Sequence, residues 1–433
     1  MTHNHLAFVF GTALSALSCG ADSQPEDHAG AGASSSAGGQ AGATAAVGGG
    51  SGATASAGSA GAATGGGGAS AGTGGVAGSG GTAGAASVEG CSPPKPEDMY
   101  TPIPLLSKTG CVDASDPKKF VASAVTYQVN SPLWSDNADK SRAFVLPTGK
   151  KIHVRNCAAS AADCAKSDLA DDGRWDFPVG SVMIKIFMVD GKLVETRLFM
   201  HMGSDTGADA GWVGYSYQWN EAQTDATIVP SDRQAVMFNT GKQTVTWHYP
   251  SRQDCMDCHN KAAGFTLGPE TAQMNRVLAG TNQIDALAAR NLFDVAPTKP
   301  YKAALVTPYP VSNAAPAADA TVAQEARSYL HANCAFCHRP GGMFDAFDLR
   351  YDTALADSKL CGLGTKGQVG SNPSLKILSP GTSADSLIIE RMSVTNDNYS
   401  DVRMPQIGSY VVDGTGVPLV QQWIDALPAS TCL

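Results

Sequence analysis

Two copies of one short motif constrain this chain more than any other feature of its sequence. The first copy is Cys255-Met-Asp-Cys258-His259, and the second, 79 residues further on, is Cys334-Ala-Phe-Cys337-His338. The pattern Cys-x-x-Cys-His is typical of c-type haem attachment, because two thiols on one helical turn can bond to the two vinyl groups of one haem. The histidine that follows can then ligate the iron. We therefore expect two haem c groups, with His259 and His338 as proximal iron ligands.

Zinc binding or thiol redox chemistry is the general alternative for paired cysteines. A closed zinc site needs a second ligand pair, and zinc modules usually place that pair within about 20 residues. The nearest second pair here is the other motif, much further along the chain. The histidine directly after the second cysteine of each copy also favours haem.

A methionine downstream of the second motif is the expected axial ligand of its haem. Met404 directly precedes Pro405, and a proline fixes the local loop and pushes the residue before it towards extended conformations. We expect Met404 to ligate the iron opposite His338, with Met392 and Met343 as weaker alternatives. The sixth ligand of the first haem stays open, and the nearest candidates are Met274, His248, His201 and Met256.

The amino terminus predicts export. An apolar run from Leu6 to Leu17 precedes Cys19, and its length fits a signal-peptide core better than a membrane span. Cys19 stands where a lipoprotein cysteine would stand, so we expect a periplasmic or cell-surface protein with Cys19 as a candidate lipid anchor. Residues 27–87 are almost all Gly, Ala, Ser and Thr. Such a segment cannot offset the entropy of ordering, and we expect a flexible tether.

Cysteine usage agrees with an oxidising compartment. The chain has 11 cysteines; four belong to the two motifs and Cys19 is the candidate lipid anchor, which leaves six. An even remainder in an exported chain suggests disulfide bonds. Spacing alone cannot fix the connectivity, but we expect the pairs Cys91–Cys111, Cys157–Cys164 and Cys361–Cys432.

The region before the first motif predicts β structure. Two β-prone runs flank Asp190-Gly191, which is a strong hairpin signal. Trp212–Trp219 and Thr244–Tyr249 predict further strands, and we expect the aromatic row of Tyr215, Tyr217 and Trp219 to be core. The expected fold class is multidomain, with an antiparallel β-sandwich-like domain followed by mainly α haem domains of cytochrome c type. The predicted capping box at Thr321 begins the helix that leads into Cys334.

Several motifs together resemble a family of exported bacterial di-haem c-type cytochromes. They are Ser131-Pro-Leu-Trp-Ser-Asp136, Glu195-Thr-Arg197, Gly211-Trp-Val-Gly-Tyr215 and Tyr249-Pro-Ser-Arg252 ahead of Cys255. The helix before Cys334, Met404-Pro405 and a closing helix near 415–427 are similar to a class I cytochrome c domain. The expected boundaries are 1–19 for a signal peptide, 20–90 for the tether, 91–250 for the β domain, 251–316 for the first haem segment with a linker, and 317–433 for the class I domain.

The resemblance implies electron transfer rather than a known substrate. We expect an electron carrier, with redox proteins as donor and acceptor. Two other functions are open: a peroxidase-like oxidoreductase with an open first haem, and a ligand- or sugar-binding β domain coupled to the haems. The net charge of −9 argues against nucleic acid as a partner.

Overall fold

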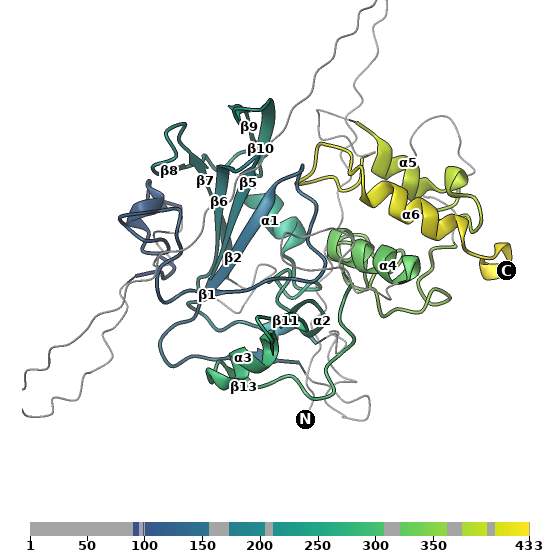
Figure 1. Cartoon of the computed structure of the whole chain (residues 1–433), viewed down its shortest axis with the longest axis horizontal. Helices are drawn as coiled ribbons and strands as arrows, with labels where there is room; N and C mark the ends of the chain where they lie inside the picture. The colour runs from purple at the N-terminus through teal and green to yellow at the C-terminus, as the bar shows by residue number, and fades with distance from the viewer. Residues whose placement is uncertain are drawn as a thin grey trace, which may run out of the picture. The chain divides into compact units, whose positions relative to one another are not determined.

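The computed structural model describes residues 90–94, 98, 100–155, 173–203, 211–306, 321–361, 375–395 and 403–432 (Figure 1). They belong to one compact unit, Gly81–Leu433. The predicted signal peptide, the tether, Cys19 and the pair Cys157–Cys164 lie outside the described residues. Within those residues, no helix has both the length and the apolar character that crossing a membrane requires.

Most of the regular structure is β. The strands are β1 (Val125–Thr126), β2 (Asp139–Val145), β3 (Ile152–Val154), β4 (Trp175–Asp176), β5 (Val182–Val189), β6 (Lys192–His201), β7 (Trp212–Trp219), β8 (Ala226–Ile228), β9 (Gln234–Asn239), β10 (Thr244–Tyr249), β11 (Val277–Leu278), β12 (Thr281–Asn282) and β13 (Phe293–Val295). The main sheet has six antiparallel strands in the order β1-β2-β5-β6-β7-β8, and β9 pairs with β10. A three-stranded sheet has the order β13-β3-β4.

The hairpin predicted at Asp190-Gly191 is confirmed. β5 and β6 pair from Val182↔Met200 to Val189↔Lys192. Asp190 and Gly191 connect them with φ values of 53° and 83°, and two positive φ angles give a turn whose twist matches the flanking strands. The strands expected at Trp212–Trp219 and Thr244–Tyr249 are also present.

Both faces of the main sheet are covered, which explains why β5 and β6 are apolar at nearly every position. Successive side chains of a strand point to opposite faces. Ile184, Leu198 and Tyr215 pack on one face against the segment that begins at Cys91. Met183 and Phe199 belong to a second cluster on the other face, which also receives Cys255. Tyr215, Tyr217 and Trp219 are 1–3% exposed, as expected for core residues.

Short helices follow the sheet. They are α1 (Arg252–Cys258), α2 (Thr271–Met274), α3 (Gln283–Ala289), α4 (Val322–Asn333), α5 (Leu387–Ser393) and α6 (Gly416–Asp425), together with 3-10 turns at Leu106–Lys108, Ser383–Asp385 and Ala429–Cys432. The capping box predicted at Thr321 and Gln324 is present at the start of α4. α4 and α6 share one apolar cluster (Figure 1). A Cβ at Gly416 would lie 2.4 Å from the Tyr329 ring, so this close crossing requires glycine.

The expected fold class is wrong. The structure is mostly β, with 21% helix and 25% strand, and no mainly α cytochrome domain is evident in the part of the chain that it describes. Among the described residues no second sheet of comparable size faces the main sheet; its second face is covered by α1 and by the chain that follows it. The C-terminal part holds α4, α5 and α6, and much of the described chain between them is irregular. Strand periodicity shows that a face is buried, but it cannot show whether a sheet or a helix covers it.

Two of the three predicted disulfide bonds are present. Cys91–Cys111 closes the segment that covers the first face of the main sheet. Cys361–Cys432 spans 71 residues and ties the C-terminal turn back to the residues before α5. A cross-link over a long loop stabilises a fold chiefly by restricting the unfolded chain.

We predict that replacing both Cys361 and Cys432 with serine lowers the free energy of unfolding by about 2–4 kcal/mol. Urea denaturation measures this difference, and the wild-type protein under reducing conditions serves as a comparison. An unchanged denaturation midpoint in the double variant would show that the bond contributes nothing to the fold.

Candidate functional site

The two cysteine motifs meet in the folded chain. Cys258 and Cys337 line one cavity, and their thiols are close enough for each to shift the pKa of the other. The Cys337 thiol donates to the carbonyl oxygen of Asp257 at 3.8 Å. Asn260 Nδ2, just beyond the first motif, donates to the carbonyl oxygen of Phe336 at 3.2 Å. Two sites that are remote in sequence therefore form one centre.

The first site consists of Cys255, Cys258 and His259 on and directly after α1. Ser251 and Asp254 form a capping box at the start of this helix, and Arg233 forms a salt bridge with Asp254. Capping satisfies backbone N–H groups that would otherwise lack partners. Cys255 packs on β7 at Gly214. A Cβ at position 214 would lie only 2.5 Å from the sulfur of Cys255. A residue without a side chain lets α1 approach the sheet at this point.

Hydrogen bonding fixes the tautomer of His259. Its Nδ1 lies 2.5 Å from the carbonyl oxygen of Phe265, so Nδ1 carries the proton and Nε2 keeps its lone pair. A histidine that ligates a metal usually donates its other N–H in this way. Burial lowers the pKa of His259 to about 4. The imidazole is therefore neutral near pH 7, which is the form that binds metal.

The second site consists of Cys334, Cys337 and His338, directly after α4. Burial lowers the pKa of His338 to about 4 as well, although the backbone of Phe344 acts in the opposite direction. Among the described residues, the buried Nδ1 of His338 has no hydrogen-bond partner. The imidazole stacks on Phe347 with ring centroids 4.4 Å apart. Packing rather than hydrogen bonding therefore orients this ring.

The second site opens into a cavity of about 690 Å³. Its lining includes Cys334, Cys337, His338 and the thiol-bearing Cys258, and Met404 from a distant loop. Sequence reasoning named Met404, and Met404 and His338 both line this cavity. Met343 and Met392, the weaker alternatives, also line the cavity.

Arg403, which the sequence analysis did not single out, holds the loop that carries Met404. It is 4% exposed. Its guanidinium donates to the carbonyl oxygens of Ser409 at 3.0 Å and of Val411 at 2.8 Å. These contacts close the loop on itself next to Met404. In the sequence, this role is indicated by the position of Arg403 directly before Met404-Pro405.

The motif Ser131–Asp136 connects the sheet region to the second site. The backbone N–H of Trp134 donates to the side-chain oxygen of Asn333 at 2.6 Å, directly before Cys334. The carboxylate of Asp136 accepts from the backbone N–H groups of Tyr410 and Val411, each at 2.8 Å. The motif thus holds both the end of α4 and the Met404 loop.

The first site faces a narrower cavity of about 160 Å³. None of the four candidates for its sixth ligand lines this cavity; they are Met274, His248, His201 and Met256. Met274 is fully buried in the core, and His201 stacks on Trp212 with ring centroids 4.5 Å apart.

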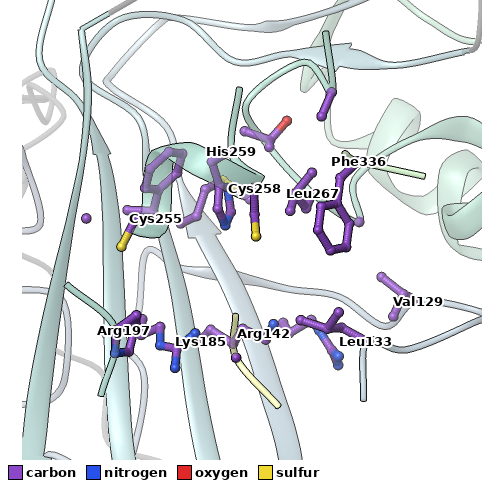
Figure 2. A pocket seen from close by; sticks show the side chains of 18 of the residues that line it. Val129, Leu133, Arg142, Lys185, Arg197, Cys255, Cys258, His259, Leu267 and Phe336 are labelled. Atoms are coloured by element: carbon purple, nitrogen blue, oxygen red, sulfur yellow. The ribbon is translucent and has the colours of Figure 1, made fainter. Parts of the chain in front are cut away.

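Three cationic side chains line the opposite side of this cavity. They are Arg142, Lys185 and Arg197, and they face Cys255, Cys258 and His259 (Figure 2). Arg197 belongs to the motif Glu195-Thr-Arg197, but sequence reasoning gave none of the three a role at this site, because a single cation in each strand has no distinctive spacing.

The four motif cysteines are free thiols, whereas other cysteines of the described chain form disulfide bonds. Burial raises the pKa of Cys255 to about 11 and that of Cys334 to about 12. A zinc site would hold deprotonated thiolates in a cluster. The described residues contain no group of three or more side chains arranged to hold a metal ion. Burial of Cys255 and Cys334 therefore opposes the thiolate form that zinc requires.

Covalent haem fits the same residues better. Each motif offers two free thiols and, directly after them, one imidazole. The second cavity is within the 300–1,000 Å³ typical of ligand sites. The first cavity is smaller than that range, and its wall includes the long side chains of Arg142, Lys185 and Arg197.

Comparison with known proteins gives no match among family models, curated proteins or solved structures.

We predict that Gly214→Ala destabilises the protein by about 1–3 kcal/mol, because the added methyl group would overlap Cys255. Gly414→Ala is the matched control, since a Cβ there meets no atom within 4 Å. Thermal and urea unfolding of both variants measure the difference. Equal stability of the two variants would contradict the close packing of α1 on β7.

Proposed function

We propose that this chain is an exported c-type cytochrome that relays electrons through two covalently attached haems. Cys255 and Cys258 would hold the first haem with His259 as iron ligand. Cys334 and Cys337 would hold the second, with His338 and Met404 as ligands. The motifs resemble those of exported bacterial di-haem cytochromes, and redox proteins would be the electron donor and acceptor.

The contact between Cys258 and Cys337 carries the proposal. A thioether bond at each sulfur would make the two attached groups neighbours, because both residues line one cavity and each thiol shifts the pKa of the other. Two adjacent redox groups let one electron pass through the chain without a mobile intermediate. A protein that used each motif independently would have no need to bring these two thiols together.

The direction of transfer follows from the ligands. A thioether ligand raises the reduction potential of a haem, and Met404 lines the cavity of the second site only. The second haem would therefore have the higher potential, and electrons would move from the first to the second. The chain's own contribution is to fix the ligands: Phe265 orients His259, and Arg403 and Asp136 hold the Met404 loop.

A peroxidase-like oxidoreductase is the second candidate. None of the four expected sixth ligands lines the first cavity, which favours an open position at the first iron. Binding of cyanide or hydrogen peroxide by the ferric protein would support this activity. The sugar-binding alternative loses its basis, because Tyr215, Tyr217 and Trp219 are buried.

We predict two covalent haems per chain. We also predict an optical charge-transfer band, from the methionine sulfur to ferric iron, that depends on Met404. Intact mass and the pyridine haemochrome spectrum of protein made with a c-type maturation system give the haem count. Met404→Ala should abolish the thioether-to-ferric charge-transfer band and lower the potential of one centre, while Met343→Ala serves as the control. A chain without covalent haem would refute the proposal, and a band that survives Met404→Ala would exclude this ligand.

A further inference from the structure

Three cations stand directly opposite one another on the covered face of the main sheet. Arg142 on β2 pairs with Lys185 on β5, and Lys185 pairs with Arg197 on β6. We call these residues the cation ladder. Figure 2 shows them in a row below Cys255, Cys258 and His259, and all three line the first cavity.

Such a row is costly for the isolated chain. Like charges directly opposite on neighbouring strands destabilise a sheet, and a cation loses solvation when it is buried. Burial lowers the pKa of Lys185 well below its ordinary value, and the charges of Arg142, Lys140 and Arg197 add to this effect. The strand register therefore gathers three cationic side chains in one buried row.

The protein supplies one carboxylate to the ladder. Glu195 is 0% exposed and accepts from Arg197 at 2.7 and 2.8 Å. Within the described residues, neither Arg142 nor Lys185 has a carboxylate at salt-bridge distance. Arg142 donates to the carbonyl oxygen of Lys140 at 3.3 Å, and the Lys185 ammonium lies 5.1 Å from the Phe187 ring.

The other acids at this cavity are already paired. Asp254 binds Arg233 and the N–H of Ser251, and Glu270 lies 2.7 Å from His331. When its three members are protonated, the ladder therefore has three positive charges against the single charge of Glu195. The surplus is two positive charges on the wall opposite the first site.

We propose that the cation ladder is the receptor for the two propionate carboxylates of the haem held by Cys255 and Cys258. This inference rests on the proposed function. Thioether attachment consumes the vinyl groups of a haem and leaves two carboxylates, whose charge equals the surplus. Guanidinium groups bind carboxylates with paired hydrogen bonds, and ammonium groups bind them as point charges.

The narrowness of the first cavity agrees with this role. The flexible arms of Arg142, Lys185 and Arg197 form part of its wall. Carboxylates bound at their charged ends would draw these arms away from the space that the macrocycle needs. The ladder would thereby orient the first haem and set its potential, because nearby positive charge favours the reduced iron.

The test is a redox titration of the intact di-haem protein and of Lys185→Gln and Arg142→Gln. Each variant removes one charge from the ladder. We expect the first haem, which is the centre that Met404→Ala leaves unaltered, to become harder to reduce. At a fixed ambient potential its ratio of reduced to oxidised iron should fall on the order of tenfold, for a unit charge about 10 Å away at an effective dielectric constant of about 20.

Two further variants separate charge from packing. Lys185→Arg keeps the positive charge, so the reduction potential of the first haem should be close to that of the wild type. Lys242→Gln removes an ammonium group that is 75% exposed and lies outside the cavity lining. This variant should leave the reduction potentials of both haems unchanged. Inorganic phosphate or succinate added to the wild type should alter neither the potential nor the melting temperature, because the propionates already occupy the ladder.

Unchanged potentials in both Lys185→Gln and Arg142→Gln, with two haems still attached, would overturn the inference and leave the proposed function standing. So would phosphate or succinate binding that Lys185→Gln abolishes, since the ladder would then be open to free anions. A wild-type chain without haem at Cys255 and Cys258 would refute both the proposed function and this inference. If Lys185→Gln fails to fold, Arg142→Gln and Lys185→Arg still decide the outcome.

Discussion

The approach of the two motifs at Cys258 and Cys337 is the constraint on which the arrangement of this centre depends. It requires α1 and the end of α4 to be held in fixed positions from opposite sides. The sheet holds α1 through the close approach at Gly214 and the cap at Ser251. The segment Ser131–Asp136 holds the end of α4 through Asn333. The main sheet and the C-terminal helices are therefore parts of one structure around the paired motifs.

The two sites within that structure differ in their surroundings. The second is lined mainly by Met343, Met392, Met404 and other apolar side chains, with Asp345 and Arg391 as its charged residues. The first is bounded by the cation ladder on one wall and by paired acids elsewhere. Polarity and charge around a redox group tune its potential. The proposed relay would therefore have a more apolar environment at one haem and a more charged environment at the other.

Local sequence patterns predicted the local features of this structure well. The Asp190-Gly191 turn, the capping box at Thr321 and the disulfide bonds Cys91–Cys111 and Cys361–Cys432 all follow from chemistry that acts within a strand, a turn or a compartment. The fold class did not follow. A buried strand face has the same pattern whether a second sheet or a helix covers it, so the sandwich was expected where α1 packs instead.

The same limit applies to the site. Cys334, Cys337, His338 and Met404 could be named together because their motif spacing implies a chemistry. The meeting of Cys258 with Cys337 and the alignment of Arg142 with Lys185 depend on how distant segments pack and on strand register. No spacing within the sequence encodes either of them.

Magnetic interaction between the two irons tests the central claim most directly. Electron paramagnetic resonance spectra of the fully oxidised protein and of the half-reduced protein, in which only the first haem is ferric, should differ at the first haem. Neighbouring ferric centres broaden each other's signals and speed their relaxation, so the first-haem signal should sharpen once the second iron is reduced. A first-haem signal that is identical in both states would show that the two haems are far apart, and it would contradict a relay built on the contact between Cys258 and Cys337.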